Sequence, residues 1–132
     1  MEYKAKLRYL RMSPRKVRRV ADLVRGMGVE KALETLYFVP KAASHALMQT
    51  IKSAASNAIS SEGSAKIKAE DLYIKEIQID GGPTWKRILP APMGRAYRVR
   101  KRTSHVKVKL DILPERKAAH EKTKVKAKAG EK

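Results

Sequence analysis

The feature that most constrains how this chain folds is a long basic segment without acidic residues. Residues 81–110 hold nine Lys and Arg side chains and no Asp or Glu, and prolines interrupt the segment at positions 83, 90 and 92. Such a stretch cannot enter a hydrophobic core, because its cations would be buried without partners. It is also too poor in Gly and Ser to be a passive linker. We therefore expect it to project from a folded body.

A protruding β-hairpin is the simplest structure for this segment, with two strands leaving a sheet and continuing outward over about residues 81–104. About ten residues in each arm would extend it by roughly 30 Å. A two-stranded ribbon is unstable alone in water, so something outside the body must hold it. Phosphates would do so, because Arg and Lys donate charge-assisted hydrogen bonds to them. The alternative interpretation is a flexible basic loop.

The N-terminal part predicts a strand followed by a helix. Residues 3–9 alternate between apolar and basic side chains, as in a half-buried strand with Tyr9 on its apolar face. Ser13 and Pro14 fit the N-cap and first position of a helix that ends at Gly26. The apolar positions of this helix follow the helical period: Val17, Val20, Ala21 and Val24.

Two further helices are predicted before the chain returns to strands. Residues 30–38 suit a short helix that ends before Pro40. Its inward positions would be Ala32, Leu33, Leu36 and Tyr37. Residues 41–60 predict the longest helix, and its buried stripe would be Ala43, Leu47, Ile51, Ala54 and Ala58.

Two strands should follow, at residues 69–80 and 97–113, separated by a break at residues 81–83. In the first strand, alternation places Tyr73, Ile77 and Ile79 on one face and Leu72 and Ile74 on the other. The second strand would bury the side chains of Val106, Val108, Leu110 and Ile112.

The order of these elements predicts an α+β fold, in which three helices pack on a small three-stranded antiparallel sheet. Two of the strands extend into the long protruding β-hairpin. Residues 1–112 would form a single globular domain. Residues 113–132, rich in Lys, Ala, Glu and Thr, would form a basic, flexible C-terminal tail.

The charge balance indicates a polyanionic partner. The 132 residues include 31 Lys and Arg against 13 Asp and Glu, a formal net charge of +18. In a free protein this charge opposes compaction. A nucleic acid relieves the repulsion and gains affinity through counterion release. A generally basic surface without a fixed partner is the alternative, but the charge is clustered along the chain.

Other functional classes lack their sequence features. Without cysteine the chain has no disulfide or thiolate chemistry, and no apolar stretch approaches the roughly 20 residues of a membrane span. The N-terminus offers no signal-peptide pattern, so we expect a cytoplasmic protein. The histidines at 45, 105 and 120 are far apart, and no acidic pair or Gly-rich phosphate loop is present. We therefore predict no enzymatic activity, no cofactor and no metal.

A compact body with basic protrusions suits a large folded RNA, recognised by shape and backbone. The candidate RNA-binding residues are Lys4, Lys6, Arg8, Arg11, Arg15, Lys16, Arg18, Arg19, Arg25, Lys86, Arg87, Arg95, Arg98, Arg100, Lys101, Arg102, Lys107 and Lys109. One competing hypothesis is an architectural DNA-binding protein that uses Trp85 as a wedge. Another is a basic membrane-surface protein, which would need a wide face of aromatic and Leu side chains that the first helix lacks.

Six short motifs, in this order, give the chain a specific resemblance. They are MSPRKVR at 12–18, ADLVRG at 21–26, SAASNA at 53–58, DGGPTWKR at 80–87, GRA at 94–96 and KRTSHV at 101–106. Over about residues 3–112 the chain resembles bacterial ribosomal protein L-twenty-two. The resemblance implies a structural constituent of the large ribosomal subunit that binds 23S-type ribosomal RNA and supports subunit assembly.

The resemblance also implies that the hairpin tip lines the nascent polypeptide exit tunnel. There the tip would face ribosomal protein L-four across a constriction and meet the nascent polypeptide transiently, and no membrane or homo-oligomer is expected. The tip residues would be Thr84, Trp85, Lys86, Arg87, Ile88, Leu89, Pro90, Ala91, Pro92, Met93, Gly94 and Arg95. The family usually has Met at the position of Trp85 and basic residues near Ala91 and Met93, so this tip is bulkier and less cationic.

Overall fold

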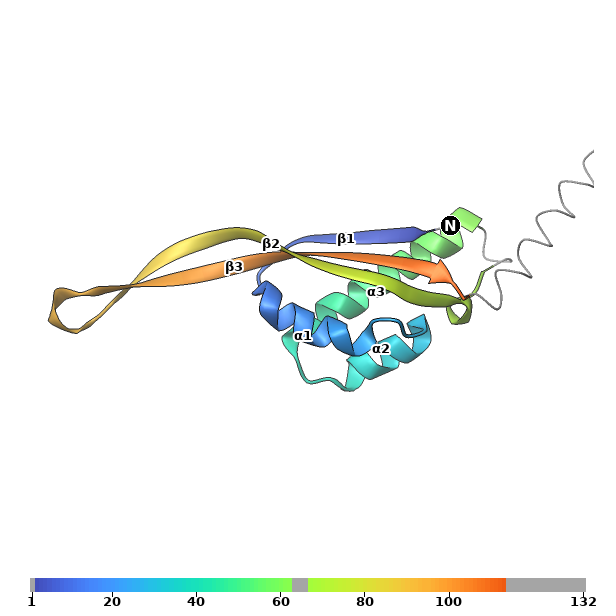
Figure 1. Ribbon diagram of the computed structural model, residues 1–132, viewed down its shortest axis with the longest axis horizontal. Helices are drawn as coiled ribbons and strands as arrows, with labels where there is room; N and C mark the ends of the chain where they lie inside the picture. The colour runs from blue at the N-terminus through green and yellow to red at the C-terminus, as the bar shows by residue number, and fades with distance from the viewer. Residues whose placement is uncertain (1, 63–66, 114–132) are drawn as a thin grey trace, which may run out of the picture.

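The computed structural model describes residues 2–62 and 67–113 (Figure 1). Its elements are β1 (Tyr3–Leu10), α1 (Pro14–Val24), α2 (Val29–Phe38), α3 (Ala42–Glu62), the 3-10 turn η1 (Ala69–Asp71), β2 (Leu72–Pro90), the 3-10 turn η2 (Pro92–Gly94) and β3 (Ala96–Ile112). The strands form one antiparallel sheet in the order β1-β3-β2. The predicted α+β fold is thereby confirmed. Residues 114–132 of the predicted tail lie outside the described residues.

The helices cover one face of the sheet, as Figure 1 shows. Helix α3 packs along β1 and β3, and α1 packs against β2. The core between these layers is aliphatic, and its largest fully buried side chains are Leu36, Leu47, Ile51, Ile67, Leu72, Ile74 and Leu110. Within the described residues, none of the helices is both long and apolar enough to span a membrane.

Helix α1 follows its sequence pattern closely. Ser13 is the N-cap in an extended conformation, and Pro14 is the first helical residue, where it has no hydrogen bond to lose. The four predicted core positions of α1 are all buried, at most 5% exposed. Gly26 has φ +79°, the left-handed conformation that glycine adopts freely after a helix end. The predicted burial pattern of α1 is confirmed.

The predicted faces of β2 are wrong, because a β-bulge lies within the strand. The register shifts by one residue between Ile74 and Glu76, so Lys75 is the extra residue. A single extra residue reverses the inside–outside alternation that follows it. As a result Ile77 and Ile79 lie on the same buried face as Ile74, instead of on the opposite face.

Two tyrosines predicted to face inward are exposed. Tyr9 has φ +57° beside a register shift between Leu7 and Leu10, and its side chain is 60% exposed. The irregular backbone turns it away from the core, so the strict alternation expected for β1 fails there. On α2 the inward positions are taken by Val29, Ala32 and Leu36, and Tyr37 is 77% exposed.

The hairpin consists of the distal halves of β2 and β3, which stay paired far beyond the helices (Figure 1). The expected break at residues 81–83 is a second bulge, after which β2 continues to Pro90. Between the pairs Gly81↔Ser104 and Thr84↔Arg102, β2 advances three residues while β3 advances two. The turn is closed by a hydrogen bond from the Ala91 N–H to the Arg95 carbonyl, 2.9 Å.

Every irregularity of the sheet lies in β1 or β2, so β3 runs without a bulge from end to end. Its even-numbered residues therefore share one face. Under the helices these residues are the buried Val106, Val108, Leu110 and Ile112. Beyond the helices the same face carries Arg98, Arg100 and Arg102, all exposed. The fully buried Ser104 marks the change from core to protrusion.

The hairpin leaves the body at a very tight contact. A Cβ at Gly82 would lie well inside van der Waals contact with the Thr103 hydroxyl oxygen and 3.1 Å from Nε2 of His105. Thr103 is buried, and its hydroxyl donates a 2.7 Å hydrogen bond to the Pro83 carbonyl, so it cannot move aside without losing this bond. The φ of Gly82 is not positive, so its backbone conformation would allow another residue. Glycine is required there because a side chain would not fit.

We predict that Gly82→Ala destabilises the fold by about 1–3 kcal/mol, the usual range for overpacking. The matched control is Gly81→Ala, because a Cβ there would first meet Cγ of Pro14 at an ordinary 3.9 Å. Urea unfolding followed by circular dichroism measures both free energies. Equal stability of the two variants would show that the close approach at Gly82 is not a constraint.

Candidate nucleic-acid interface

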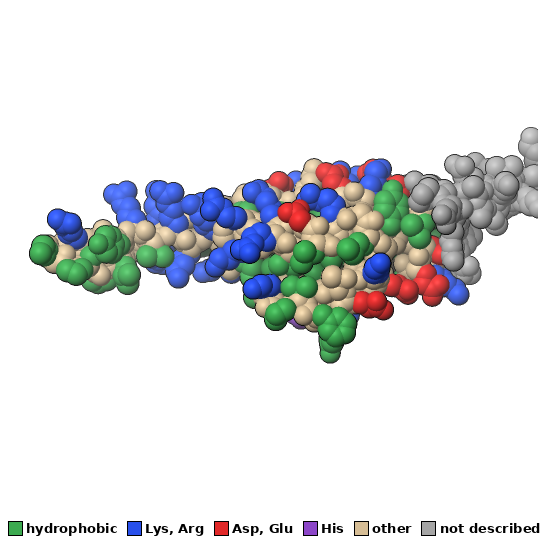
Figure 2. Space-filling model, turned by 60° about the horizontal axis from the view of Figure 1, so that its bottom comes forward, with side chains coloured by type: hydrophobic (Ala, Val, Ile, Leu, Met, Phe, Trp, Pro, Cys, Tyr) green, Lys and Arg blue, Asp and Glu red, His purple; other side chains and the backbone are tan. Residues whose placement is uncertain are grey.

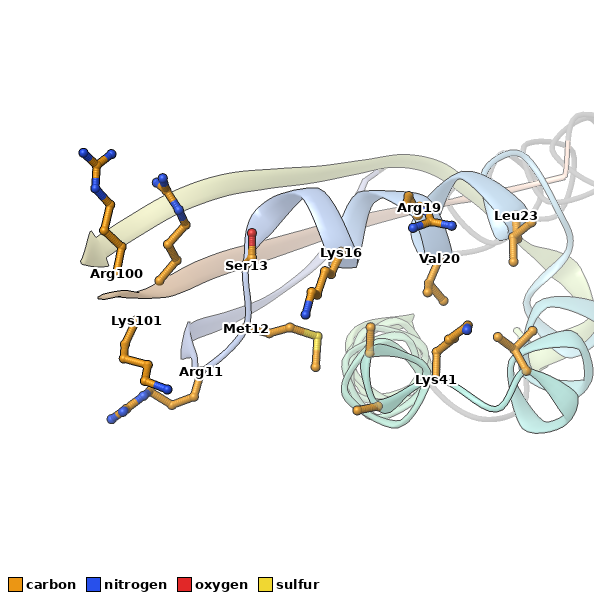
Figure 3. A pocket seen from close by; sticks show the side chains of 14 residues that line it. Arg11, Met12, Ser13, Lys16, Arg19, Val20, Leu23, Lys41, Arg100 and Lys101 are labelled. Atoms are coloured by element: carbon orange, nitrogen blue, oxygen red, sulfur yellow. The ribbon is translucent and has the colours of Figure 1, made fainter. Parts of the chain in front are cut away.

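A groove lies where the hairpin leaves the body (Figure 3). Four segments form it: the link between β1 and α1, one side of α1, the residues that lead into α3 with its first turn, and the β3 stem of the hairpin. Its volume is about 1000 Å³, and it is open to solvent along one side. The lining residues are Arg11, Met12, Ser13, Lys16, Arg19, Val20, Leu23, Val39, Lys41, Ala42, Ala43, Arg100, Lys101 and Arg102.

The groove is cationic on its walls and apolar on its floor. Seven of its lining residues are Lys or Arg, and none is Asp or Glu. In Figure 3, Lys16 points from α1 into the space between α1 and α3, while Arg11 and Lys101 reach the same end of the groove. Met12 and Val20 supply apolar surface between these cations. Such a groove fits a phosphate backbone, with room for a sugar or base against the floor.

The structure brings together residues that the sequence placed in separate clusters. Arg11, Lys16 and Arg19 belong to the N-terminal cluster, whereas Arg100, Lys101 and Arg102 belong to the hairpin. Lys41, which directly precedes α3, also lines the groove and was not among the predicted RNA-binding residues. No sequence signal places it here, because its position depends on how α3 lies beside α1. Within the described residues the structure shows no group of His, Cys, Asp or Glu side chains suited to a metal ion.

Three other candidate lysines lie on the uncovered face of the sheet and pair with carboxylates. Lys107 Nζ lies 2.8 Å from Asp80 Oδ2, Lys109 Nζ lies 2.6 Å from Glu76 Oε2, and Lys4 Nζ lies 3.5 Å from Glu2 Oε2. The hydrogen bond and charge of Lys107 lower the pKa of Asp80. The hydrogen bond from Lys109 lowers the pKa of Glu76, and Glu76 in turn raises the pKa of Lys109. Lys107 and Lys109 thus each have a carboxylate partner of their own, whereas Lys4 shares Glu2 with Lys75, whose Nζ lies closer to it, at 2.6 Å.

Two candidate arginines fasten α1 to β2. Arg18 donates through Nη2 and Nε to the Ile79 carbonyl, at 2.8 and 3.3 Å. Arg25 donates to the Ile77 carbonyl at 3.3 Å and pairs with Asp22 at 3.1 Å. Both guanidinium groups therefore stabilise the body, which leaves them less free to contact an external anion.

The remaining candidates are exposed and make no ion pair within the described part of the chain. Besides the groove residues, they are Lys6, Arg8, Arg15, Lys86, Arg87, Arg95 and Arg98. Figure 2 shows Lys and Arg side chains along the hairpin stems, hydrophobic side chains gathered near its tip, and Asp and Glu side chains on the body. The unpaired positive charge thus concentrates on the hairpin and at its base.

The end of the hairpin is apolar and exposed. Met93 is 92% exposed, Ile88 is 74% exposed and Leu89 is 55% exposed. Met93 has φ +62° in the turn, which an ordinary side chain adopts at a cost. This much exposed apolar surface on a two-stranded ribbon points to a contact outside the chain, and one that does not consist only of phosphate.

We predict that Arg18→Gln lowers the free energy of unfolding by about 1 kcal/mol, because it removes hydrogen bonds that join α1 to β2. Arg15→Gln makes the same change of charge at an exposed residue without such a bond and should leave stability unchanged. Urea denaturation at matched ionic strength measures both. If the two variants unfold alike, Arg18 does not have this structural role.

Comparison with known proteins places the chain beside one family. The model of the family described as ribosomal protein L22p/L17e matches residues 5–111. A large ribosomal subunit protein uL22 from Chlorobium phaeobacteroides is 50% identical over 113 residues, which cover 86% of this chain and 97% of the relative. The protein of the same name from Desulfotalea psychrophila is 50% identical over 111 residues, covering 84% and 98%. Both relatives are thus similar to this chain over almost their whole length.

Proposed function

Because the chain belongs to the ribosomal protein L22p/L17e family and is a structural constituent of the large ribosomal subunit, not an enzyme, we propose that it binds 23S-type ribosomal RNA through the groove and the hairpin. By holding separate RNA segments together it would support assembly of the subunit. The outermost part of the hairpin tip, residues 90–95, would line the nascent polypeptide exit tunnel. The protein would act in the cytoplasm, within the large subunit.

The acid-free groove is the observation that carries this proposal. Its seven cations come from elements far apart in the sequence, yet they line one open cavity at the hairpin base. Cations held this close repel one another, and a polyanion removes that repulsion. A phosphate backbone in the groove would gain charge-assisted hydrogen bonds and release its counterions.

The ion pairs within the protein narrow the set of RNA contacts. Lys107 and Lys109 would have to exchange a carboxylate for a phosphate, which yields little net gain. Arg100, Arg102 and the other unpaired cations have no such exchange to make. We therefore assign RNA binding mainly to the groove and the hairpin stems, and not to the uncovered face of the sheet.

The apolar turn suits a different surface. Pro90 to Arg95 project furthest from the body, and Met93 at the turn is almost fully exposed. We propose that this turn lies at the tunnel wall, where it would face ribosomal protein L-four and meet nascent polypeptides. Nascent peptides vary in sequence and charge, so the surface that meets them needs no particular charge. An apolar turn without acidic groups fits this role.

We predict that the triple variant Lys41→Gln, Arg100→Gln, Arg102→Gln binds large-subunit ribosomal RNA more weakly. The slope of log affinity against log salt concentration should fall in magnitude by about 2–3, because each lost phosphate contact removes roughly 0.7–0.9. Filter binding of the full chain to transcribed 23S-type RNA at several salt concentrations gives this slope.

The matched control removes the same charge from paired lysines: Lys75→Gln, Lys107→Gln, Lys109→Gln. This variant should change the slope by less than one, because each of these side chains has a carboxylate partner within 3 Å. An equal effect of the two triple variants would mean that net charge alone governs binding. Equal affinity of the unaltered chain for random duplex DNA would favour the architectural DNA-binding protein instead.

We also predict that a photo-crosslinking residue at Met93, in assembled ribosomes that are translating, reacts with the nascent chain. The same residue at Arg98, on the cationic stem, should react with ribosomal RNA. Gel analysis of the labelled peptide and RNA separates the products. Reaction with RNA alone at both positions would place the turn inside the RNA, away from the tunnel.

A further inference from the structure

The two faces of the hairpin differ in chemistry. In an antiparallel pair, residues directly opposite each other project to the same face. The pairs Thr84↔Arg102, Lys86↔Arg100 and Ile88↔Arg98 therefore form one face, which is mainly cationic. The pairs Trp85↔Lys101, Arg87↔Val99 and Leu89↔Tyr97 form the opposite face.

The second face combines aromatic rings with a guanidinium group. Trp85 is 50% exposed and Tyr97 is 59% exposed. The guanidinium carbon of Arg87 lies 5.5 Å from the Trp85 ring centroid, within cation–π distance. Leu89 and Val99 add aliphatic surface beside the rings. We name this set, Trp85, Arg87, Leu89, Tyr97 and Val99, the aromatic face.

An exposed aromatic face on a thin ribbon needs a flat partner. A two-stranded hairpin has no core of its own in which these rings could be buried. Bases that are unpaired in a folded RNA are flat, and proteins bind them by stacking them on aromatic side chains and Arg planes. A duplex offers only its backbone and groove edges, so it would not use the rings.

A peptide is a poorer fit to the same surface. The two cavities at the base of the hairpin and on the body are not lined by Trp85, Leu89 or Tyr97. The aromatic face lies outside both of them, on a two-stranded ribbon. It also carries Arg87 and Lys101 and no carboxylate, which favours an anionic partner.

We propose that the aromatic face stacks on unpaired nucleobases, while the cationic face of Arg98, Arg100 and Arg102 binds phosphates. The inference rests on the proposed binding of ribosomal RNA and adds which part of that RNA the hairpin recognises. The hairpin then lies between two RNA surfaces, one of which presents backbone and the other bases. The apolar turn beyond Pro90 stays free for the tunnel.

The test uses the only tryptophan of the chain, Trp85, as its own reporter. The full chain is titrated with single-stranded oligoadenylate and with duplex RNA of the same number of phosphates, and tryptophan fluorescence is followed. Stacking predicts strong quenching by the single strand. The duplex should bind, as measured by anisotropy of the labelled RNA, with little quenching.

Variants separate stacking from charge. Trp85→Leu and Tyr97→Leu should each weaken binding of the single strand about tenfold, in line with the loss of one stacked base, and leave the salt slope unchanged. Trp85→Phe keeps a ring and should retain most of the affinity. Ile88→Ala, on the cationic face, is the matched apolar control and should have no effect. All three residues are exposed, so the fold should tolerate these changes.

Three results would decide the matter against the proposal. Unchanged affinity of both Leu variants, with both RNAs still bound, would reject base stacking and leave the proposed RNA binding intact. Equal quenching by single strand and duplex would also reject it. Failure to bind either RNA at low salt would instead contradict the proposed function itself.

Discussion

The structure depends on one strand, β3, which pairs with β2 along its whole length and with β1 over residues 104–110, and which contains no bulge. Because its alternation is regular, every second residue lies on the same face. The surroundings of that face change along the strand. Under the helices, Val106, Val108, Leu110 and Ile112 are buried in the hydrophobic core, together with side chains of β1 and β2. Beyond Ser104 the same face carries arginines, because no helix is left to cover it. The division between the body and the hairpin, for which we propose RNA binding, thus follows from the course of one continuous strand.

The register shifts of the sheet lie in the other two strands, β1 and β2. The bulge at Gly82 lets β2 follow β3 outward, and the missing side chain leaves space for Thr103 and His105. Tyr9 leaves the core where β1 ends, and its N–H donates a 3.0 Å hydrogen bond to Nδ1 of His105. Its ring packs edge-on against the same histidine, with centroids 4.8 Å apart. These contacts connect all three strands at the point where the hairpin departs, so that its base is fixed to the body.

Elements in which hydrophobic residues follow a regular period could be predicted from the sequence, whereas departures from that period could not. The core faces of α1 and of β3 follow unbroken periods and were predicted correctly. The side chains that share a face of β2 were predicted wrongly, because no residue near Lys75 indicates that the strand has an extra residue there. The basic hairpin followed from the missing acids and the prolines. The groove could not be predicted, since Lys41 lines it only because of how the helices pack. The pairing of Lys107 with Asp80 could not be predicted either, because it depends on strand register.

The central claim is that the hairpin has no core of its own and is held in place by RNA. Hydrogen exchange of backbone amides, measured by mass spectrometry on the free chain and on its complex with 23S-type RNA, tests this most directly. In the free chain, amides of residues 84–102 should exchange far faster than those of residues 106–112, which lie between two strands and under the helices. In the complex, both segments should exchange slowly. Slow exchange throughout the hairpin in the free chain, or fast exchange in both states, would contradict the account.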